Sequence, residues 1–154
     1  MENYIFWILL IAYSAHILEE YFMDWKKWVY IITKIDISWN EFYLINCILI
    51  VYAICIANIG IKNLYISLTL PALMIINAFV FHIFPTIIKK KISPGFFSSI
   101  ILFLPLSTFT FFQIGKMNKL TMEIIIVAFI GGFLINIYPI ILNKIRNKIN
   151  KEMQ

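Results

Sequence analysis

The sequence predicts an all-α integral membrane protein whose five transmembrane helices form one bundle. Of its 154 residues, 62% are hydrophobic and only 14% are charged, and the mean hydropathy is +0.87, whereas soluble domains carry about 25% charged residues. So few polar groups cannot cover a water-soluble globule, and a disordered chain would need a far lower hydrophobicity. Five apolar stretches reach about 20 residues, which is the length of helix that crosses a bilayer.

The predicted spans are residues 4–23, 42–60, 64–88, 96–114 and 122–142. The N-terminal region carries Glu2 rather than basic residues, so the first span is expected to remain in the protein and not to be a cleaved signal peptide. Residues 61–63 leave room only for a tight turn, which predicts an antiparallel hairpin of the second and third spans. For the fourth span, Ser93 is the expected N-cap and Pro94 the first helical residue.

In the fifth span, Ala128 and Gly132 form a small-xxx-small pair, which is typical of two helices that pack closely. The sequence shows no internal repeat and no low-complexity linker. Residues 1–154 are therefore expected to form a single membrane domain.

The distribution of Lys and Arg predicts the orientation of the bundle. With five spans, ten of these residues fall on the side that holds residues 24–41, 89–95 and 143–154, and three fall on the other side. Because cytoplasmic loops hold an excess of Lys and Arg, the N-terminus is expected outside and the C-terminus in the cytoplasm. Residues 24–41 contain Trp25, Trp28 and Trp39 and are expected to be an interfacial loop, while residues 143–154 form a basic tail.

The net charge of +5 does not indicate a nucleic-acid-binding protein. The basic residues lie in short runs between apolar stretches, and attraction to anionic membrane lipids accounts for the basic tail. Twelve lysines against one arginine, with many isoleucines and asparagines, are typical of an AT-rich bacterial genome. We therefore expect a multi-pass protein of a bacterial inner membrane whose partners are membrane lipids and no nucleic acid.

The first span contains three ionisable side chains, His16, Glu19 and Glu20. Placing such a residue at the centre of a bilayer costs about 2.5–3.5 kcal/mol, so each is a candidate for function. At about 100° per residue, His16 and Glu20 lie about 40° apart and Glu19 lies about 60° to the other side of His16. All three can therefore face one interior.

Alternating helix direction places polar residues of the other four spans at the same depth as this cluster. They are Asn46, His82, Ser98, Ser99 and Asn136. The sequence thus predicts one polar layer in the cytoplasmic leaflet, with Asn46 and Asn136 as supporting residues. Amides and hydroxyls at such depths are also typical of hydrogen bonds that only hold helices together, so this alternative stays open.

Imidazole and carboxylate groups are ligands for Zn²⁺, Fe²⁺ or Mn²⁺. His16 and Glu20 lie one helical turn apart and His82 would supply a third ligand, while Glu19 would act as general base or support the ligands. The leading hypothesis is therefore a metal-dependent enzyme, with Glu19 and His82 as catalytic groups, that acts on a lipid-like hydrophobic molecule. It requires His82 to lie within about 8 Å of His16 or Glu20, because ligand bonds are about 2.0–2.2 Å long.

Three other functions remain open. The same groups could form a metal-free acid/base isomerase or hydrolase of a hydrophobic substrate, such as a sterol-like or isoprenoid lipid, with Glu19 or Glu20 protonated beside His82. A small-ligand transporter or binder would use the same polar layer. In a purely structural subunit, the first span would end early and its polar residues would reach the interface.

The run His16-Ile17-Leu18-Glu19-Glu20 resembles the signature of the HXXEE family of small multi-pass membrane proteins. In that pattern an Asn precedes a His by four residues in a later span, and a Tyr-x-Pro-Gly motif follows. Here Asn77 precedes His82 by five residues, and residues 92–95 read Ile-Ser-Pro-Gly. Five residues turn an α-helix by about 140°, so Asn77 and His82 are not expected to share a face. The resemblance implies His16, Glu19, Glu20 and His82 as site residues and names no substrate.

Overall fold

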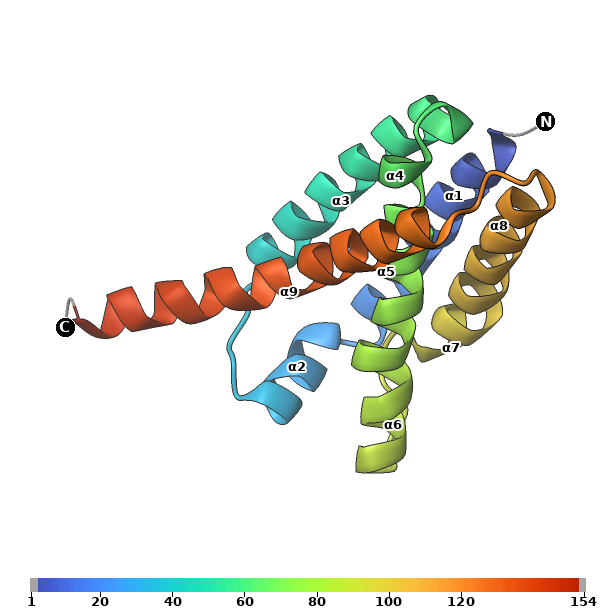
Figure 1. Ribbon diagram of the computed structural model, residues 1–154. Coiled ribbons are helices and arrows are strands. Elements are labelled where there is room, and N and C mark those ends of the chain that lie inside the picture. Colours follow the sequence, from blue (N-terminus) through green and yellow to red (C-terminus); the bar gives the residue numbers. More distant parts are fainter. Residues whose placement is uncertain (1–2, 153–154) are drawn as a thin grey trace.

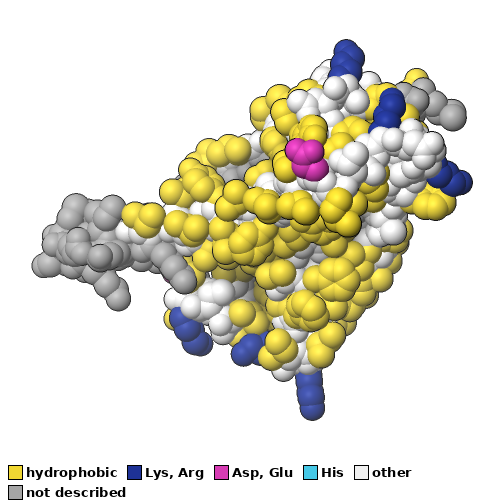
Figure 2. Space-filling view, in the orientation of Figure 1, with side chains coloured by type: hydrophobic (Ala, Val, Ile, Leu, Met, Phe, Trp, Pro, Cys, Tyr) yellow, Lys and Arg dark blue, Asp and Glu magenta, His cyan; other side chains and the backbone are white. Residues whose placement is uncertain are grey.

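The computed structural model describes residues 3–152, and all regular secondary structure in this range is helical. Five stretches are long and apolar enough to cross a membrane: Tyr4–Phe22, Trp39–Lys62, Leu64–Lys89, Phe96–Lys116 and Met122–Asn143. The all-α class and the five candidate spans are thereby confirmed, whereas the orientation of the termini stays a prediction. Figure 2 shows hydrophobic side chains over most of one face, with Lys and Arg at its upper and lower margins. This surface suits a multi-pass membrane protein.

The helices of the first half are α1 (Tyr4–Phe22), α2 (Trp25–Thr33), α3 (Trp39–Ile59) and the 3₁₀ turn η1 (Gly60–Lys62). The third span consists of α4 (Leu64–Ser67), α5 (Thr69–Asn77), the π-helix η2 (Ala78–Ile83) and α6 (Phe84–Lys89). The fourth consists of α7 (Phe96–Ser98), the π-helix η3 (Ser99–Phe103) and α8 (Leu104–Lys116), and α9 (Met122–Glu152) is the last helix. Figure 1 shows the spans gathered in one bundle, with α9 crossing it obliquely.

The turn between the second and third spans is as tight as predicted. Gly60 has a positive φ of 53°, and the side chain of Asn3 lies against it and accepts a hydrogen bond from the Ile61 amide at 3.3 Å. Asn63 then caps α4, because its side chain accepts from the Ile66 amide at 3.4 Å. These contacts tie the N-terminal end of α1 to the α3–α4 turn.

The third span is the centre of the bundle, since 56% of its most apolar window is buried, against 17–33% for the other four spans. The helix α9 packs closely against it, as the small-xxx-small pair predicts. Ala128 is fully buried, and a Cβ added to Gly132 would lie 2.6 Å from the Leu73 amide nitrogen. A larger residue at position 132 would therefore push α9 away from α5.

The third and fourth spans both leave regular α geometry one turn before a proline. The π-helix η2 precedes Pro85, and η3 precedes Pro105. A proline lacks the amide hydrogen of a regular turn, and its ring clashes with the carbonyl four residues earlier. In a π-turn the hydrogen bonds run between residues five apart, so residues with that spacing stack on one face.

The segment predicted as an interfacial loop contains the short amphipathic helix α2. The Asp24 side chain caps it by accepting a hydrogen bond from the Lys27 amide at 3.4 Å, and Trp28 is buried against the bundle. Lys34 ends the helix in the left-handed conformation, with φ of 60°. One side of α2 thus closes the bundle at the end where α1 finishes (Figure 1).

The start of α3 is joined to α9 across this end of the bundle. Ser38 and Glu41 form a capping box, so α3 begins at Trp39, three residues before the predicted start of the span. Arg146 of α9 forms an ion pair with Glu41 and donates a hydrogen bond to the Asp36 carbonyl at 3.3 Å. The backbone of α9 continues as a helix to Glu152, through most of the predicted basic tail.

Candidate metal centre

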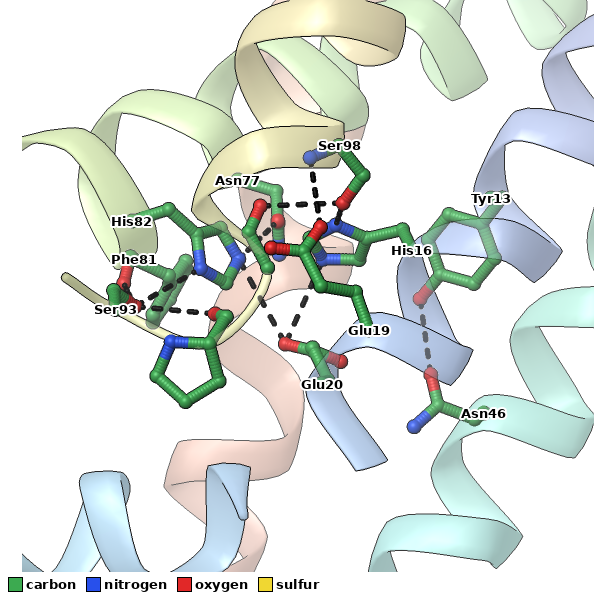
Figure 3. Close-up of polar contacts among 12 residues, drawn as sticks. Tyr13, His16, Glu19, Glu20, Asn46, Asn77, Phe81, His82, Ser93 and Ser98 are labelled. Atoms are coloured by element: carbon green, nitrogen blue, oxygen red, sulfur yellow. Dashed lines mark hydrogen bonds and ion pairs between the residues drawn. The ribbon is translucent and has the colours of Figure 1, made fainter. Parts of the chain in front are cut away.

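Three buried side chains from two spans meet below the middle of the bundle. His16 and Glu20 lie on consecutive turns of α1, and His82 lies in η2, with exposed fractions of 2%, 7% and 0%. One ligand atom from each residue falls within 4.8 Å of the other two. The proximity required for a shared metal ion is therefore met, and Figure 3 shows the three groups pointing toward one another.

The separations of these atoms suit ligands of one ion. The Glu20 Oε1 atom lies 3.6 Å from His16 Nε2 and 3.7 Å from His82 Nε2. Two ligands held at tetrahedral angles by bonds of about 2.0–2.2 Å lie about 3.3–3.6 Å apart. The two rings meet edge to face with centroids 4.7 Å apart, and each has its Nε2 atom on the side of the Glu20 carboxylate.

Two serine hydroxyls fix the outer nitrogens of the imidazoles. His16 Nδ1 lies 2.8 Å from Ser98 Oγ, which donates to the Gly95 carbonyl at 3.3 Å. His82 Nδ1 lies 3.2 Å from Ser93 Oγ, which donates to the Phe81 carbonyl at 3.2 Å. A hydroxyl that donates to a carbonyl accepts from the imidazole, so these two contacts favour the tautomer with the proton on Nδ1 in each ring. In that tautomer both Nε2 lone pairs face Glu20.

This arrangement leaves three acceptors facing one another in a buried place. His16 Nε2 is fully buried and has no hydrogen-bond partner among the described residues. Burying a polar atom without a partner costs about 1–3 kcal/mol. A cation between the carboxylate and the two nitrogens would satisfy all three, so the donor set fits a divalent metal.

Asn77 reaches His82, contrary to the expectation from α-helical geometry. Its Oδ1 atom lies 2.9 Å from His82 Nε2. The expectation was wrong because residues 78–83 form the π-helix η2, in which residues five apart share a face. The extra residue between Asn77 and His82 is thus absorbed without turning the asparagine away from the site.

Asn136 supports this contact from α9. Its Nδ2 group donates to the Leu73 carbonyl at 3.0 Å, and its Oδ1 atom accepts from Asn77 Nδ2 at 3.3 Å. The carboxamide of Asn77 is therefore oriented with its oxygen toward His82. The fifth span is linked to the site through two amides rather than by direct contact.

Gly95 lies directly under both imidazoles. It has φ of 87°, and a Cβ added to it would lie 2.6 Å from His16 Cε1 and 2.7 Å from His82 Cε1. The expectation that Ser93 caps the fourth span and Pro94 begins it is wrong, because α7 begins at Phe96 and Gly95 is its N-cap. The chain instead adopts at Gly95 a left-handed conformation that favours glycine, and this brings the backbone against the two rings.

The carboxylate of Glu19 caps the fourth span in place of Ser93. Its two oxygens accept hydrogen bonds from the amides of Phe97 at 3.0 Å and Ser98 at 2.7 Å. These are among the amides that a helix leaves without partners at its N-terminus, where a negative charge is also favourable. Glu19 thus ties α1 to the segment that carries Ser98, and its role as general base stays a prediction.

Asn46 and Ser99, the other two residues predicted for the polar layer, have no contact with the three ligand groups. Asn46 Oδ1 accepts from the Tyr13 hydroxyl at 3.3 Å, and its Nδ2 group donates to the Phe42 carbonyl at 3.0 Å. Ser99 is fully buried, and its hydroxyl has no hydrogen-bond partner among the residues that the structure describes. Asn46 therefore joins α1 to α3 one turn away from His16.

A cavity of about 140 Å³ lies beside Glu20. Its polar end is formed by Tyr13, Glu20, Asn46, Asn77 and Asn136, which include both predicted supporting residues. Most of the remaining lining side chains are apolar and come from α2, α3, η2, α9 and the segment between α2 and α3. The site thus adjoins a space that suits a hydrophobic molecule.

The family described as "Protein of unknown function with HXXEE motif" matches residues 7–110 of this chain. The chain belongs to the HXXEE family. The match contains the three ligand candidates, Glu19, Asn77 and the Ser93–Ser98 segment, whereas Asn136 lies outside it. No curated protein and no solved structure matches the chain.

Each defining residue of the HXXEE motif has its own contact in this structure. His16 and Glu20 point at the shared centre, while Glu19 points sideways and caps the fourth span. Sequence reasoning did not assign a role at the imidazoles to Ser93 or Gly95. The Pro-Gly pair in the HXXEE pattern was the one sequence signal that this turn is important. It could not indicate that two imidazoles pack against Gly95, because the residue type of a turn does not show which side chains contact it.

Proposed function

We propose that this HXXEE protein is a membrane enzyme that binds a divalent metal ion with His16, Glu20 and His82 and acts on a lipid-like substrate. The observation that carries the proposal is the convergence of three acceptor atoms within 4.8 Å of one another in a buried place. Because both Nδ1 atoms are held by serine hydroxyls, the Nε2 atoms are the ones available to a metal. The adjoining cavity supports a hydrophobic substrate.

In this proposal the metal ion and the residues around it have separate roles. A bound Zn²⁺, Fe²⁺ or Mn²⁺ ion would act as a Lewis acid toward a substrate oxygen or a water molecule. Ser93 and Ser98 orient the imidazoles, and Asn77 lies within reach of the same centre. Of the two roles considered for Glu19, the contacts favour the supporting one, since both its oxygens accept backbone amides.

The predicted orientation places this chemistry in the cytoplasmic half of the membrane. The site lies toward the end of α1 that adjoins α2 and residues 90–95 (Figure 3). The distribution of Lys and Arg assigns this end to the cytoplasm. The substrate would then be drawn from the cytoplasmic leaflet of a bacterial inner membrane.

Metal content of the purified full-length protein tests the proposal. We expect about one Zn, Fe or Mn ion per chain by elemental analysis, and we expect Glu20→Ala to lose it because two imidazoles alone bind weakly. Glu123→Ala is the matched control, since Glu123 is an exposed carboxylate in the first turn of α9. A wild-type protein that holds no metal, even after exposure to each ion, would overturn the proposal.

One contact favours a metal-free acid/base enzyme as the second candidate. The distance of 2.9 Å between His82 Nε2 and Asn77 Oδ1 is that of a hydrogen bond, which would need the proton on Nε2. The two candidates thus require different tautomers of His82. Nitrogen NMR of labelled histidine distinguishes them, because Nε2 is the metal-bound nitrogen in the first and the protonated one in the second.

A further inference from the structure

The cavity beside Glu20 indicates the class of molecule that the site accepts. The inference rests on the proposed function in one respect, that Glu20 belongs to the reactive site. The apolar wall comes from α2, the segment after it, α3 and α9, with these side chains among its members: Trp25, Val29, Ile35, Ile37, Phe42, Ile45, Leu49, Ile135, Pro139 and Ile140. A hydrocarbon chain is the ligand that such a wall favours.

The side chains that line the cavity offer no positive charge to an anionic head group. No Lys, Arg or His is found among the described residues that line the cavity, and Glu20 is their only carboxylate. A phosphate or a fatty-acid carboxylate would have to enter beside a carboxylate in a place of low dielectric, with no cationic side chain of the lining to offset it. The lining side chains by themselves therefore favour an uncharged head group over that of a phospholipid.

The polar end suits an uncharged head that donates a hydrogen bond. In the described part of the chain, the only groups within ion-pair distance of the Glu20 carboxylate are the two imidazoles, at 3.6 and 3.7 Å. Both distances exceed that of a hydrogen bond, so the carboxylate retains capacity to accept. The amides of Asn77 and Asn136 and the Tyr13 hydroxyl are neutral groups at the same end. A hydroxyl can donate to Glu20 and accept from a neutral neighbour.

The size of the cavity sets how much of the ligand it encloses. An apolar cavity of about 150 Å³ holds a molecule of the size of benzene, and this cavity measures about 140 Å³. Only the head and the first carbons of a long chain fit inside. Large apolar side chains next to the wall are exposed, among them Tyr30, Ile31, Tyr138 and Ile141, so the rest of the chain can lie along apolar surface.

We propose that the cavity binds an uncharged long-chain lipid alcohol, with its hydroxyl group at Glu20 and its hydrocarbon chain leaving between α2 and α9. The hydroxyl oxygen then lies beside His82 and Asn77, within the polar layer of the HXXEE site. A long-chain primary alcohol and an isoprenoid alcohol share this chemistry. The inference assigns the substrate class of the site and does not depend on which metal the site holds.

Photolabelling of the full-length protein in detergent tests this assignment. Three probes share a hexadecyl chain with a diazirine near the head group. Their head groups are a hydroxyl, a sulfonate and a trimethylammonium group. We expect the alcohol to label residues of the cavity wall at least about tenfold more than the sulfonate, which corresponds to a like-charge penalty of one decade in affinity. Equal labelling by all three heads, or preferential labelling by either charged head, would overturn the assignment.

A matched pair of substitutions locates the binding site. Ile140 lines the cavity and its neighbour Ile141 on α9 is exposed, so Ile140→Trp should abolish labelling by the alcohol and Ile141→Trp should preserve it. Val29→Trp and Ile31→Trp form the same pair on α2 and decide the question if Ile140→Trp fails to fold. Equal effects of both members of a folded pair would refute the location.

The same experiment in the presence of a chelator separates this inference from the metal proposal. Labelling of the wall by the alcohol in chelator-treated protein supports the lipid assignment independently of the metal, and the metal proposal is judged separately by elemental analysis after exposure to each ion. A metal-loaded protein that shows no preference for the alcohol overturns the lipid assignment and leaves the metal proposal intact. Each failure is therefore recognised by its own readout.

Discussion

Replacing Gly95 with alanine should disrupt the candidate metal centre more than any substitution of comparable size. The added Cβ would lie 2.6 Å from His16 Cε1 and 2.7 Å from His82 Cε1, at a residue with φ of 87°. The left-handed conformation costs a residue other than glycine about 1–2 kcal/mol, and overpacking adds about 1–3 kcal/mol, so we expect a loss of about 2–5 kcal/mol in stability. Both imidazoles must move, and displaced ligand support typically costs metal affinity about 10–100-fold.

Gly115→Ala is the control for this change. Gly115 lies in α8 without a positive φ, and the nearest atom to an added Cβ is Leu120 Cδ2 at 3.8 Å, an ordinary contact. We expect it to keep the metal and to melt at or slightly above the wild-type temperature, because alanine favours a helix. Metal affinity by chelator competition and thermal melting of both purified variants measure the difference. The reasoning is refuted if Gly95→Ala retains wild-type metal affinity and melts with Gly115→Ala.

The contacts of the site support three further predictions. Glu19→Gln leaves one of two capped amides without an acceptor, so we expect a loss of about 1–2 kcal/mol in stability that the exposed Glu123→Gln does not show, measured by thermal melting. Asn77→Ala should cost about 1–3 kcal/mol, because it leaves partners in η2 and α9 unpaired. Asn58→Ala, which removes only an exposed bond within α3, should change stability by less than about 0.5 kcal/mol, and equal losses would contradict this. Acidification should release the metal because protons compete for both imidazoles, with metal content after dialysis as the readout, and retention at low pH would argue against histidine ligands.

Hydropathy and helix geometry were enough to predict the five candidate spans and the grouping of His16, Glu20 and His82, because both depend on residue spacing along straight helices. The same geometry failed at Asn77, since nothing in the residue types of η2 distinguishes a π-turn from an α-turn. It also missed Gly95, whose importance comes from two rings that reach it from distant parts of the chain. Local pattern thus located the ligand groups, and tertiary contacts decided what orients them.

A deletion in η2 tests whether the π-turn exists to keep Asn77 and His82 together. Removing Val80, which is 46% exposed, leaves these two residues four apart, the spacing implied by the HXXEE pattern. Residues four apart share a face of an α-helix, so the segment can become regular without rotating the rest of the third span, and we expect the metal to be retained. Removing Val51, which is 59% exposed in regular α3, turns the second half of that helix by about 100° relative to its first half, so we expect the fold to be lost. If the Val80 deletion loses the metal as completely as the Val51 deletion, the π-turn does more than accommodate one extra residue between Asn77 and His82. That explanation for their contact would then be wrong.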